Sequence, residues 1–328
     1  MGEKQIQKKQ SPRLKPKSLA FYTIGLVILG YLIYRLDVST IGQSFKTIGT
    51  GIFYIYLAFI PRLILGTLCI HNLIHRKVSF WTTLYNQLTG NSYNNIIPLA
   101  GLGGEPYKIQ HFSKYVGIEF ATKAIVRDRM IHMLTGTLFS SLSAFTMVSL
   151  IELETELRLA ILIIASVLLA FSIAAIFLTI SSAPVKFSGF ILKKLKFLEK
   201  FESERLSKRR FLLSFIFKLG ARSMSMLEVA VILTLLGYSA SFTNVITVTS
   251  MLSLSASIFF IVPQGMGVNE GGTSWAFVLL GLDASVGFSL GLIRRARIIS
   301  FALLGIIIQL IAVSYKKLTV SVEKVHTE

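Results

Sequence analysis

The sequence predicts an all-α polytopic membrane protein that contains an inverted repeat, with about six full spans plus two re-entrant hairpins. Three observations lead to this fold class. Of the 328 residues, 53% are hydrophobic and only 15% are charged, whereas a soluble domain normally carries about 25% charged residues. Apolar segments long enough to cross a bilayer recur along the whole chain. Two further apolar regions are each interrupted by a Gly/Pro-rich motif, and the two motifs resemble one another.

Six segments have the length and composition of a full span, at residues 18–36, 50–74, 130–151, 157–180, 211–237 and 285–313. Two regions, 79–125 and 242–282, are apolar but broken in the middle by glycine and proline. Because an unsatisfied backbone polar group costs several kcal/mol in lipid, such breaks persist only where protein or water surrounds them. We therefore expect each region to be a re-entrant hairpin, or a pair of half-helices, that lines a cavity.

The charge distribution predicts the orientation in the membrane. Basic residues are concentrated in the N-terminal tail and in the stretch 186–210, whereas the acidic stretch 152–156 lies between two spans. The positive-inside rule places the basic segments in the cytoplasm and the acidic one outside. This clustering between spans also argues against nucleic acid as a partner, despite a net charge of +18, and it favours contact with anionic lipid head groups.

The motifs in the two broken regions correspond in spacing. The first reads PLAGLGGEP and begins at residue 98, and the second reads PQGMGVNEG and begins at residue 263. In each, a proline precedes a glutamate by seven residues, a G-x-G pattern lies between them, and an arginine follows the glutamate by 24 residues. The matched residues are Pro98 and Pro263, Gly101 with Gly103 and Gly265 with Gly267, Glu105 and Glu270, and Arg129 and Arg294. The chain therefore contains two copies of one unit.

The number of crossings predicts that the second copy is inserted upside down. Three crossings separate the start of the span at 50–74 from the start of the span at 211–237, and three is an odd number. Inverted repeats with broken helices that meet near the midplane recur in transporters. We expect a basic cytoplasmic tail at 1–17, a single integral membrane domain at 18–314 with repeats at about 50–151 and 211–313, and a cytoplasmic tail at 315–328.

The motif residues have the chemistry to bind an anionic head group. Glycine lets backbone N–H groups approach a ligand closely, and arginine offers a planar fork to phosphate. We expect a half-helix to start just after each glutamate, with Pro106 at the first helical position, so that its positive end points at the break. Charge inside a membrane is costly and marks a candidate functional site. The expected substrate-binding residues are Gly101, Gly103, Gly104, Glu105, Arg129, Gly265, Gly267, Glu270, Arg294 and Asn95.

Several roles stay open for the two glutamates. They could bind a cationic head group, exchange protons, or hold the arginines in place, and a purely structural Glu–Arg pair in each hairpin also accounts for the pattern. We expect no catalytic residues and no cofactor, because the sequence has no Ser-His-Asp pattern, Walker loop or cysteine cluster. His71 and His75 are spaced for a metal, but they lie beside Arg76 and Lys77, so we expect no metal site.

The motifs resemble a known family. PLAGLGGEPYK followed by Arg129, and VPQGMGVNEGG followed by GLIRRARIISFALLG, are similar to the lysylphosphatidylglycerol synthase transmembrane region. This region is the flippase-like membrane half of the bacterial multiple peptide resistance factor and also occurs as stand-alone proteins. The similarity covers about residues 18–314, with one departure at Met266 and Asn269, where the family implies a more regular Gly-rich turn.

The resemblance implies movement of a lipid, or of a lipid-linked head group, between leaflets. Two-part members carry a soluble aminoacyl-transferase domain after the membrane part, and we expect that this chain is a stand-alone member without it. Related membrane regions accompany glycosyltransferases that act on polyprenyl-phosphate lipids. We therefore expect a flippase, not an enzyme, in the cell inner membrane. Its cargo would be an anionic phospholipid, an aminoacylated lipid or a polyprenyl-phosphate-linked lipid, and its partner a separate synthase or glycosyltransferase.

Two other functions remain open. The first is an intramembrane transferase that modifies a lipid, for which Glu105, Glu270 and Asp128 are the candidate bases. The second is a scaffold that transports nothing and serves a separate synthase.

Overall fold

The computed structural model describes residues 38–96, 103–180, 206–259, 262 and 265–325. The predicted span at 18–36, the N-terminal tail, most of the basic loop at 186–210, and the motif residues Pro98, Gly101 and Pro263 lie outside the described residues.

The described part of the chain is helical and has no strand, which confirms the all-α class. Its helices are α2 Val38–Ile48, α3 Ile52–Leu73, α4 Phe80–Ile96, α5 Glu105–Val116, α6 Ile118–Leu150, α7 Thr155–Ile180, α10 Lys208–Leu235, α11 Phe242–Ile258, α12 Val268–Leu279 and α13 Ala284–Val325. A short 3₁₀ turn, η1 Gly49–Gly51, joins α2 to α3.

Within the described residues, 4 helical stretches are long and apolar enough to cross a bilayer: Ser39–Leu73, Ile118–Leu150, Thr155–Phe177 and Ala284–Ala312. They contain or closely match four of the predicted spans. The predicted span at 211–237 is also a helix, α10, of 28 residues. It is less apolar than the others because it carries Lys218, Arg222 and Glu228 along its length. The chain is thus a helical membrane protein.

Both broken regions form helix pairs, because α4 packs against α5 and α11 packs against α12. The first pair is closely packed. A Cβ on Gly104 would lie 1.8 Å from the carbonyl oxygen of Gly90, so only glycine fits there. In the second pair, a Cβ on Gly272 would lie 2.5 Å from the hydroxyl oxygen of Ser255.

The helix boundaries correct two predictions. The first hairpin ends at Gly117, whose φ of 79° turns the chain, and α6 begins at residue 118 rather than at 130. The first turns of α6 carry several charges, which hid this part of the helix from a hydropathy reading. The half-helices also start earlier than expected, α5 at Glu105 itself and α12 two residues before Glu270.

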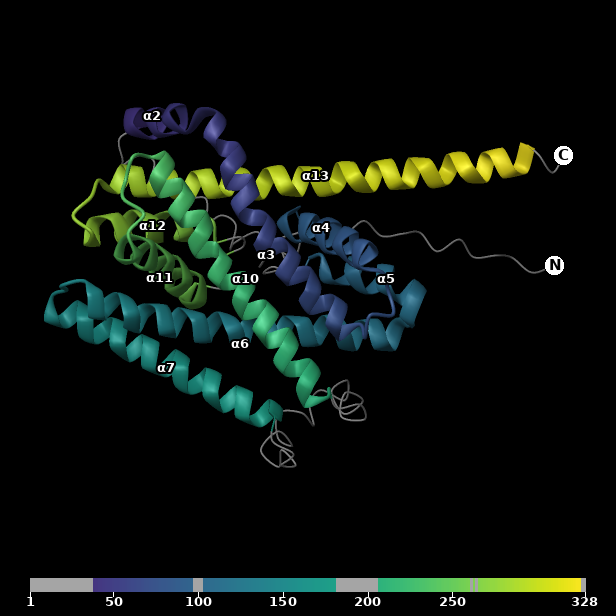
Figure 1. The fold of residues 1–328 in the computed structure, drawn as a ribbon, viewed down its shortest axis with the longest axis horizontal. Coiled ribbons are helices and arrows are strands. Elements are labelled where there is room, and N and C mark those ends of the chain that lie inside the picture. Colours follow the sequence, from purple (N-terminus) through teal and green to yellow (C-terminus); the bar gives the residue numbers. More distant parts are fainter. Residues whose placement is uncertain (1–37, 97–102, 181–205, 260–261, 263–264, 326–328) are drawn as a thin grey trace, which may run out of the picture.

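Two long helices, α3 and α10, cross the molecule between α13 on one side and α6 with α7 on the other (Figure 1). They pack against each other in opposite directions. At one end, a Cβ on Gly51 would lie 2.7 Å from the Leu235 side chain. At the other end, the Asn72 side-chain amide donates to the carbonyl oxygen of Arg210 at 2.9 Å. The helix pair α4–α5 contacts α13 through α4, and the pair α11–α12 contacts α6 through α11.

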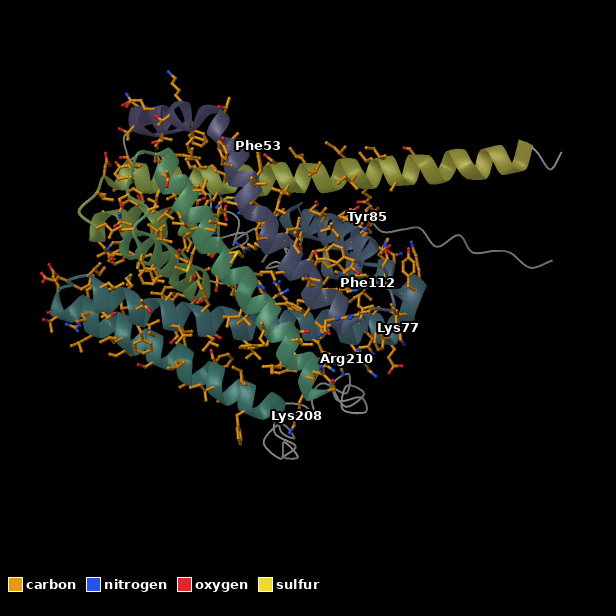
Figure 2. All side chains as sticks on the ribbon, viewed as in Figure 1. Phe53, Lys77, Tyr85, Phe112, Lys208 and Arg210 are labelled. Carbon is orange, nitrogen blue, oxygen red and sulfur yellow. The ribbon has the colours of Figure 1, made fainter. Side chains whose placement is uncertain are left out.

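The surface is apolar, as contact with lipid requires. Large hydrophobic side chains such as Phe53 and Phe177 are 65% and 67% exposed. Figure 2 shows Phe53 near one end of α3, and Lys77, Lys208 and Arg210 toward the opposite end of the α3–α10 pair. The basic side chains named here therefore gather toward one end of the α3–α10 pair.

Candidate substrate site

The interior of this apolar bundle holds many charged side chains. Among the described residues, those that are fully buried are Lys108, Lys123, Asp128, Lys218, Glu228, Glu270 and Arg297. A buried charge is costly unless it is paired and hydrogen-bonded. The partners of these residues therefore define the candidate site.

The first hairpin places its glutamate among polar side chains of α4. One carboxylate oxygen of Glu105 lies 3.7 Å from the ammonium of Lys108 and accepts from the amide of Asn94 at 3.4 Å. The carbonyl of the Asn94 amide in turn accepts from the backbone N–H of Gly104 at 2.6 Å. Lys108 also donates to the side-chain carbonyl of Asn91 at 3.0 Å. The second carboxylate oxygen of Glu105 is buried and has no hydrogen-bond partner among the described residues.

The second hairpin holds its glutamate by an arginine of α13. Glu270 is completely buried in the first turn of α12, and the guanidinium of Arg295 donates to one of its carboxylate oxygens. Arg295 also donates to the backbone carbonyl of Gly265 at 3.3 Å, so it joins the break to the first turn of α12. Gly265 and Gly267 have φ angles of 56° and 75°, in the left-handed region that glycine adopts most readily. A residue with a side chain would be strained at either position.

The ion pairs differ from those that the equal spacings suggested. Arg294 pairs with Glu228 on α10 at 3.4 Å, and its neighbour Arg295 pairs with Glu270. Successive residues of a helix point about 100° apart. Arg294 therefore faces α10, and Arg295 faces α12. In the first hairpin, the ion-pair partner of Glu105 is Lys108. The spacing of 24 residues therefore marks corresponding positions and not ion pairs.

Glu228 is a site residue that the sequence reading missed. It is completely buried on α10, and one carboxylate oxygen accepts two hydrogen bonds from Arg297, at 3.0 and 2.7 Å. The guanidinium carbon of Arg297 lies 4.0 Å above the Phe59 ring, and that of Arg62 lies 5.9 Å from the same ring. One carboxylate is thus shared by Arg297 and Arg294, with Arg62 close by. A lone glutamate inside the apolar run LEVAVILTL was the signal that could have identified it.

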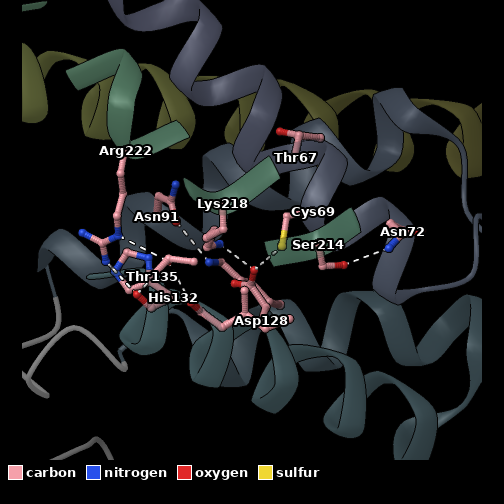
Figure 3. A network of polar contacts seen from close by, with 12 residues as sticks. Thr67, Cys69, Asn72, Asn91, Asp128, His132, Thr135, Ser214, Lys218 and Arg222 are labelled. Atoms are coloured by element: carbon pink, nitrogen blue, oxygen red, sulfur yellow. Dashed lines mark hydrogen bonds and ion pairs between the residues drawn. The ribbon is translucent and has the colours of Figure 1, made fainter. Parts of the chain in front are cut away.

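A second network connects α3, α6 and α10 (Figure 3). Asp128 forms an ion pair with Lys218 at 2.5 Å, and the Cys69 thiol donates to the same carboxylate oxygen at 3.4 Å. Lys108 of the first hairpin lies within electrostatic reach of Asp128, Lys218 and Arg129. Glu105 and Arg129 are therefore linked only indirectly. Lys108 forms the ion pair with Glu105 and is itself close to Arg129.

Arg222 is the second site residue that the sequence reading missed. From α10 it reaches α6, where its guanidinium donates to the backbone carbonyl of His132 at 2.7 Å and to the hydroxyl of Thr135 at 3.4 Å (Figure 3). Among the described residues, no carboxylate lies within ion-pair distance of Arg222. Arg62 and Arg129 are near enough to repel it electrostatically.

The remaining predicted residues lie close to these networks. Gly103 is buried beside the start of α5, Asn95 is half-buried in the last turn of α4, and Arg129 is half-buried on α6. Within the part of the chain that the structure describes, no group of three or more His, Cys, Asp or Glu side chains is arranged to hold a metal ion.

We call twelve charged side chains in these networks the interior charges. Eight are cations and four are carboxylates: Arg62, Lys108, Arg129, Lys218, Arg222, Arg294, Arg295 and Arg297, and Glu105, Asp128, Glu228 and Glu270. The interior charges therefore carry a formal excess of four positive charges (eight minus four).

The fold and this site define a helical membrane protein with an electropositive polar interior. The family model of the lysylphosphatidylglycerol synthase TM region matches residues 18–307, and the chain belongs to this family. The membership confirms the resemblance seen in the two motifs and points to a lipid-related function in a membrane. Comparison with curated proteins gives no match, and comparison with solved structures gives none either.

Proposed function

We propose that the protein is a flippase that moves a lipid with a phosphate-bearing head group between the leaflets of the cell inner membrane. Its cargo is an anionic phospholipid, an aminoacylated lipid or a polyprenyl-phosphate-linked lipid, and the protein acts as a carrier and not as an enzyme. The observation that carries this proposal is the excess of cations over carboxylates among the interior charges. Because an excess of positive charge inside an apolar bundle is costly, an anionic guest stabilises this interior. Arginine forks are well suited to phosphate oxygens.

We also infer that the two halves form an inverted repeat, because contacts between them recur after a shift of 165 residues, the distance from Pro98 to Pro263. On α6, the Ser140 hydroxyl donates to the carbonyl oxygen of Ser253 on α11 at 3.0 Å. Adding 165 to 140 gives Gly305, and subtracting 165 from 253 gives Leu88. A Cβ on Gly305 of α13 would lie 2.9 Å from the carbonyl oxygen of Leu88 on α4.

A second pair of contacts supports the same correspondence. A Cβ on Gly136 of α6 would lie 2.6 Å from the guanidinium of Arg222 on α10. The residues 165 positions away are Phe301 of α13 and Leu57 of α3. The Phe301 ring lies against Tyr56 and Phe59, on either side of Leu57, with centroid distances of 5.6 and 4.7 Å. The helices α3 and α10 hold the same place in the two repeats and run in opposite directions. An inverted repeat requires this arrangement.

The proposed arrangement in the membrane has six full spans and two opposed re-entrant hairpins, with both termini in the cytoplasm. Lys77, Lys208 and Arg210 lie toward one end of the α3–α10 pair (Figure 2). The turn between α6 and α7 contains Glu152 and Glu154 and lies at the opposite end of the molecule (Figure 1). The positive-inside rule assigns the basic end to the cytoplasm. We propose a separate synthase or glycosyltransferase as the supplier of the lipid on that side.

Reconstitution into vesicles tests the proposed function. Vesicles with and without the protein carry a trace of a fluorescent lipid with a phosphatidylglycerol, phosphatidylcholine or polyprenyl-phosphate head group. A membrane-impermeant quencher then reports how fast the inner-leaflet lipid reaches the outer leaflet. We expect faster exchange of at least one anionic lipid, and we expect Arg297→Gln to slow it strongly. Lys46→Gln, which changes an exposed residue of α2, is the matched control and should have no effect. Exchange no faster than in protein-free vesicles for all three lipids would contradict the proposal.

A further inference from the structure

The imidazole of His132 lies among cations that come from three helices. Arg222 and Lys218 of α10, Arg129 of α6 and Arg62 of α3 all act on it electrostatically. Lys218 has a partner of its own in Asp128, at 2.5 Å.

Contact between His132 and Arg222 fixes the protonation state of the imidazole. One guanidinium nitrogen of Arg222 lies 3.2 Å from the Nε2 atom of His132. Because a guanidinium can only donate, Nε2 must accept, and the imidazole is neutral with its proton on Nδ1. Gly136 makes this approach possible, since a Cβ there would lie 2.6 Å from the same nitrogen. In this state, Arg222 occupies the lone pair that a proton would need.

The neighbouring helices do not provide a carboxylate for Arg222. Glu228 of α10 attracts Arg62 electrostatically, but its carboxylate already forms ion pairs with Arg294 and Arg297 of α13. Helix α11 has no charged side chain, and the acidic residue of α7 lies in its first turn. On α5, Glu105 forms its ion pair with Lys108. Arg222, which is half-buried, thus carries a positive charge that no carboxylate of the described residues pairs with, and an anion from outside the chain can supply the missing negative charge.

We propose that Arg222 and His132 form a joint binding site for one phosphate-ester oxyanion and one proton. When the oxyanion arrives, the guanidinium of Arg222 turns from Nε2 of His132 to the oxygen of the ligand. The freed lone pair on Nε2 takes a proton from water, and the resulting imidazolium donates to the same oxyanion. One negative charge and one proton are therefore taken up together. The inference deepens the proposed function, because it makes a proton the ion that accompanies the lipid head group.

The site predicts that anion binding takes up protons from solution. The purified protein in detergent micelles is titrated with short-chain phosphatidylglycerol, and separately with inorganic phosphate, by calorimetry in two buffers of different ionisation enthalpy. We expect an uptake of about one proton for each anion bound. The affinity should then fall as the pH rises, by at most about tenfold per pH unit, which is the limit for one linked proton. The probe that binds more tightly identifies the source of the oxyanion, a lipid head group or free phosphate.

Two variants and one control separate this site from a structural contact. His132→Asn keeps an acceptor for Arg222 but cannot titrate, so it should bind the anion without proton uptake and with a flat pH profile. Arg222→Gln should weaken anion binding at least tenfold at neutral pH. His75→Asn is the control. His75 lies in the turn after α3 with a φ of 61°, which asparagine tolerates, and this variant should behave like the parent protein.

The outcomes are distinct from those of the transport assay. Binding without proton uptake in the parent protein, or unchanged uptake in His132→Asn, would overturn the joint site. If Arg222→Gln does not fold, Arg222→Lys replaces it, and unaltered affinity in the folded variant would count against the site. Proton-linked binding in a protein that fails to exchange lipid would support the site and contradict the flippase proposal alone.

Discussion

The pair of Glu270 and Arg295 offers the sharpest test of the second hairpin. Glu270 is completely buried, whereas the Arg295 side chain is 17% exposed and retains a second acceptor in the carbonyl of Gly265. Removing one member of a buried ion pair costs about 3–5 kcal/mol. We expect Arg295→Gln to lower the free energy of unfolding by about 5 kcal/mol, because it leaves a fully buried carboxylate without a cation. We expect Glu270→Gln to lower it by only about 3 kcal/mol, because Arg295 can still donate to Gly265 and reach solvent.

A double-mutant cycle measures the coupling between the two residues. The free energy of unfolding is followed in mixed micelles as the fraction of a denaturing detergent is raised. We expect Glu270→Gln and Arg295→Gln together to cost about 2–3 kcal/mol less than the sum of the single changes. Arg294→Gln is the matched control on the adjacent position, and its effect should add to that of Glu270→Gln within about 0.5 kcal/mol. Coupling of Glu270 to Arg294 instead of Arg295 would refute the packing of α12 against α13 described above.

Lipid exchange by the double variant then separates a structural pair from a substrate site. A double variant that is stable but does not exchange lipid would show that the charges do more than stabilise the hairpin, which is the outcome we expect. Recovered exchange would instead leave the pair as a structural element of the break.

Two further changes test the hairpin and the membrane topology. Gly104→Ala should destabilise the first hairpin strongly, because the added Cβ would lie 1.8 Å from a backbone carbonyl oxygen of α4. Gly42→Ala is the control, because nothing lies within 4 Å of a Cβ there. Equal melting temperatures for the two variants would contradict the close packing of the hairpin. In a variant without Cys69, a cysteine at Glu154 should react with an impermeant reagent outside intact cells, and one at Lys208 should react only after the cells are opened. Labelling of the Lys208 position from outside would reverse the proposed orientation.

The helical fold and the positions of the two hairpins could be predicted from the sequence, because they depend on the local distribution of apolar residues, glycine and proline. The Gly/Pro-rich motifs interrupt apolar runs, and the described parts of α4, α5, α11 and α12 lie where those runs were expected. The start of α6 could not be located in the same way. Its first turns contain Glu119 and Lys123, and a hydropathy average does not distinguish a polar first turn of a helix from a loop.

The partners of the charges depend on which face of a helix each side chain occupies, and spacing along the chain does not determine that face. Arg294 and Arg295 are neighbours in sequence, yet they bind carboxylates on α10 and α12. Glu228 and Arg222 were hidden for a related reason. Both are isolated charges on α10, and averaging over a span-length window conceals such charges, although intramembrane charges are rare enough to justify individual inspection.

The least apolar of the long helices, α10, contacts both α6 and α13 through its charges. Lys218 and Arg222 of α10 bind α6, and Glu228 of the same helix binds two arginines of α13. In the proposed inverted repeat, α6 and α13 are the last helices of the two repeats. The three charges are neutralised or stabilised only when α6 and α13 are both in place. A displacement of α10 relative to either helix would therefore expose charge that is costly in an apolar interior, unless an anionic guest or a proton compensates it. In the proposed flippase, this dependence links the relative position of the two repeats to the presence of the lipid head group.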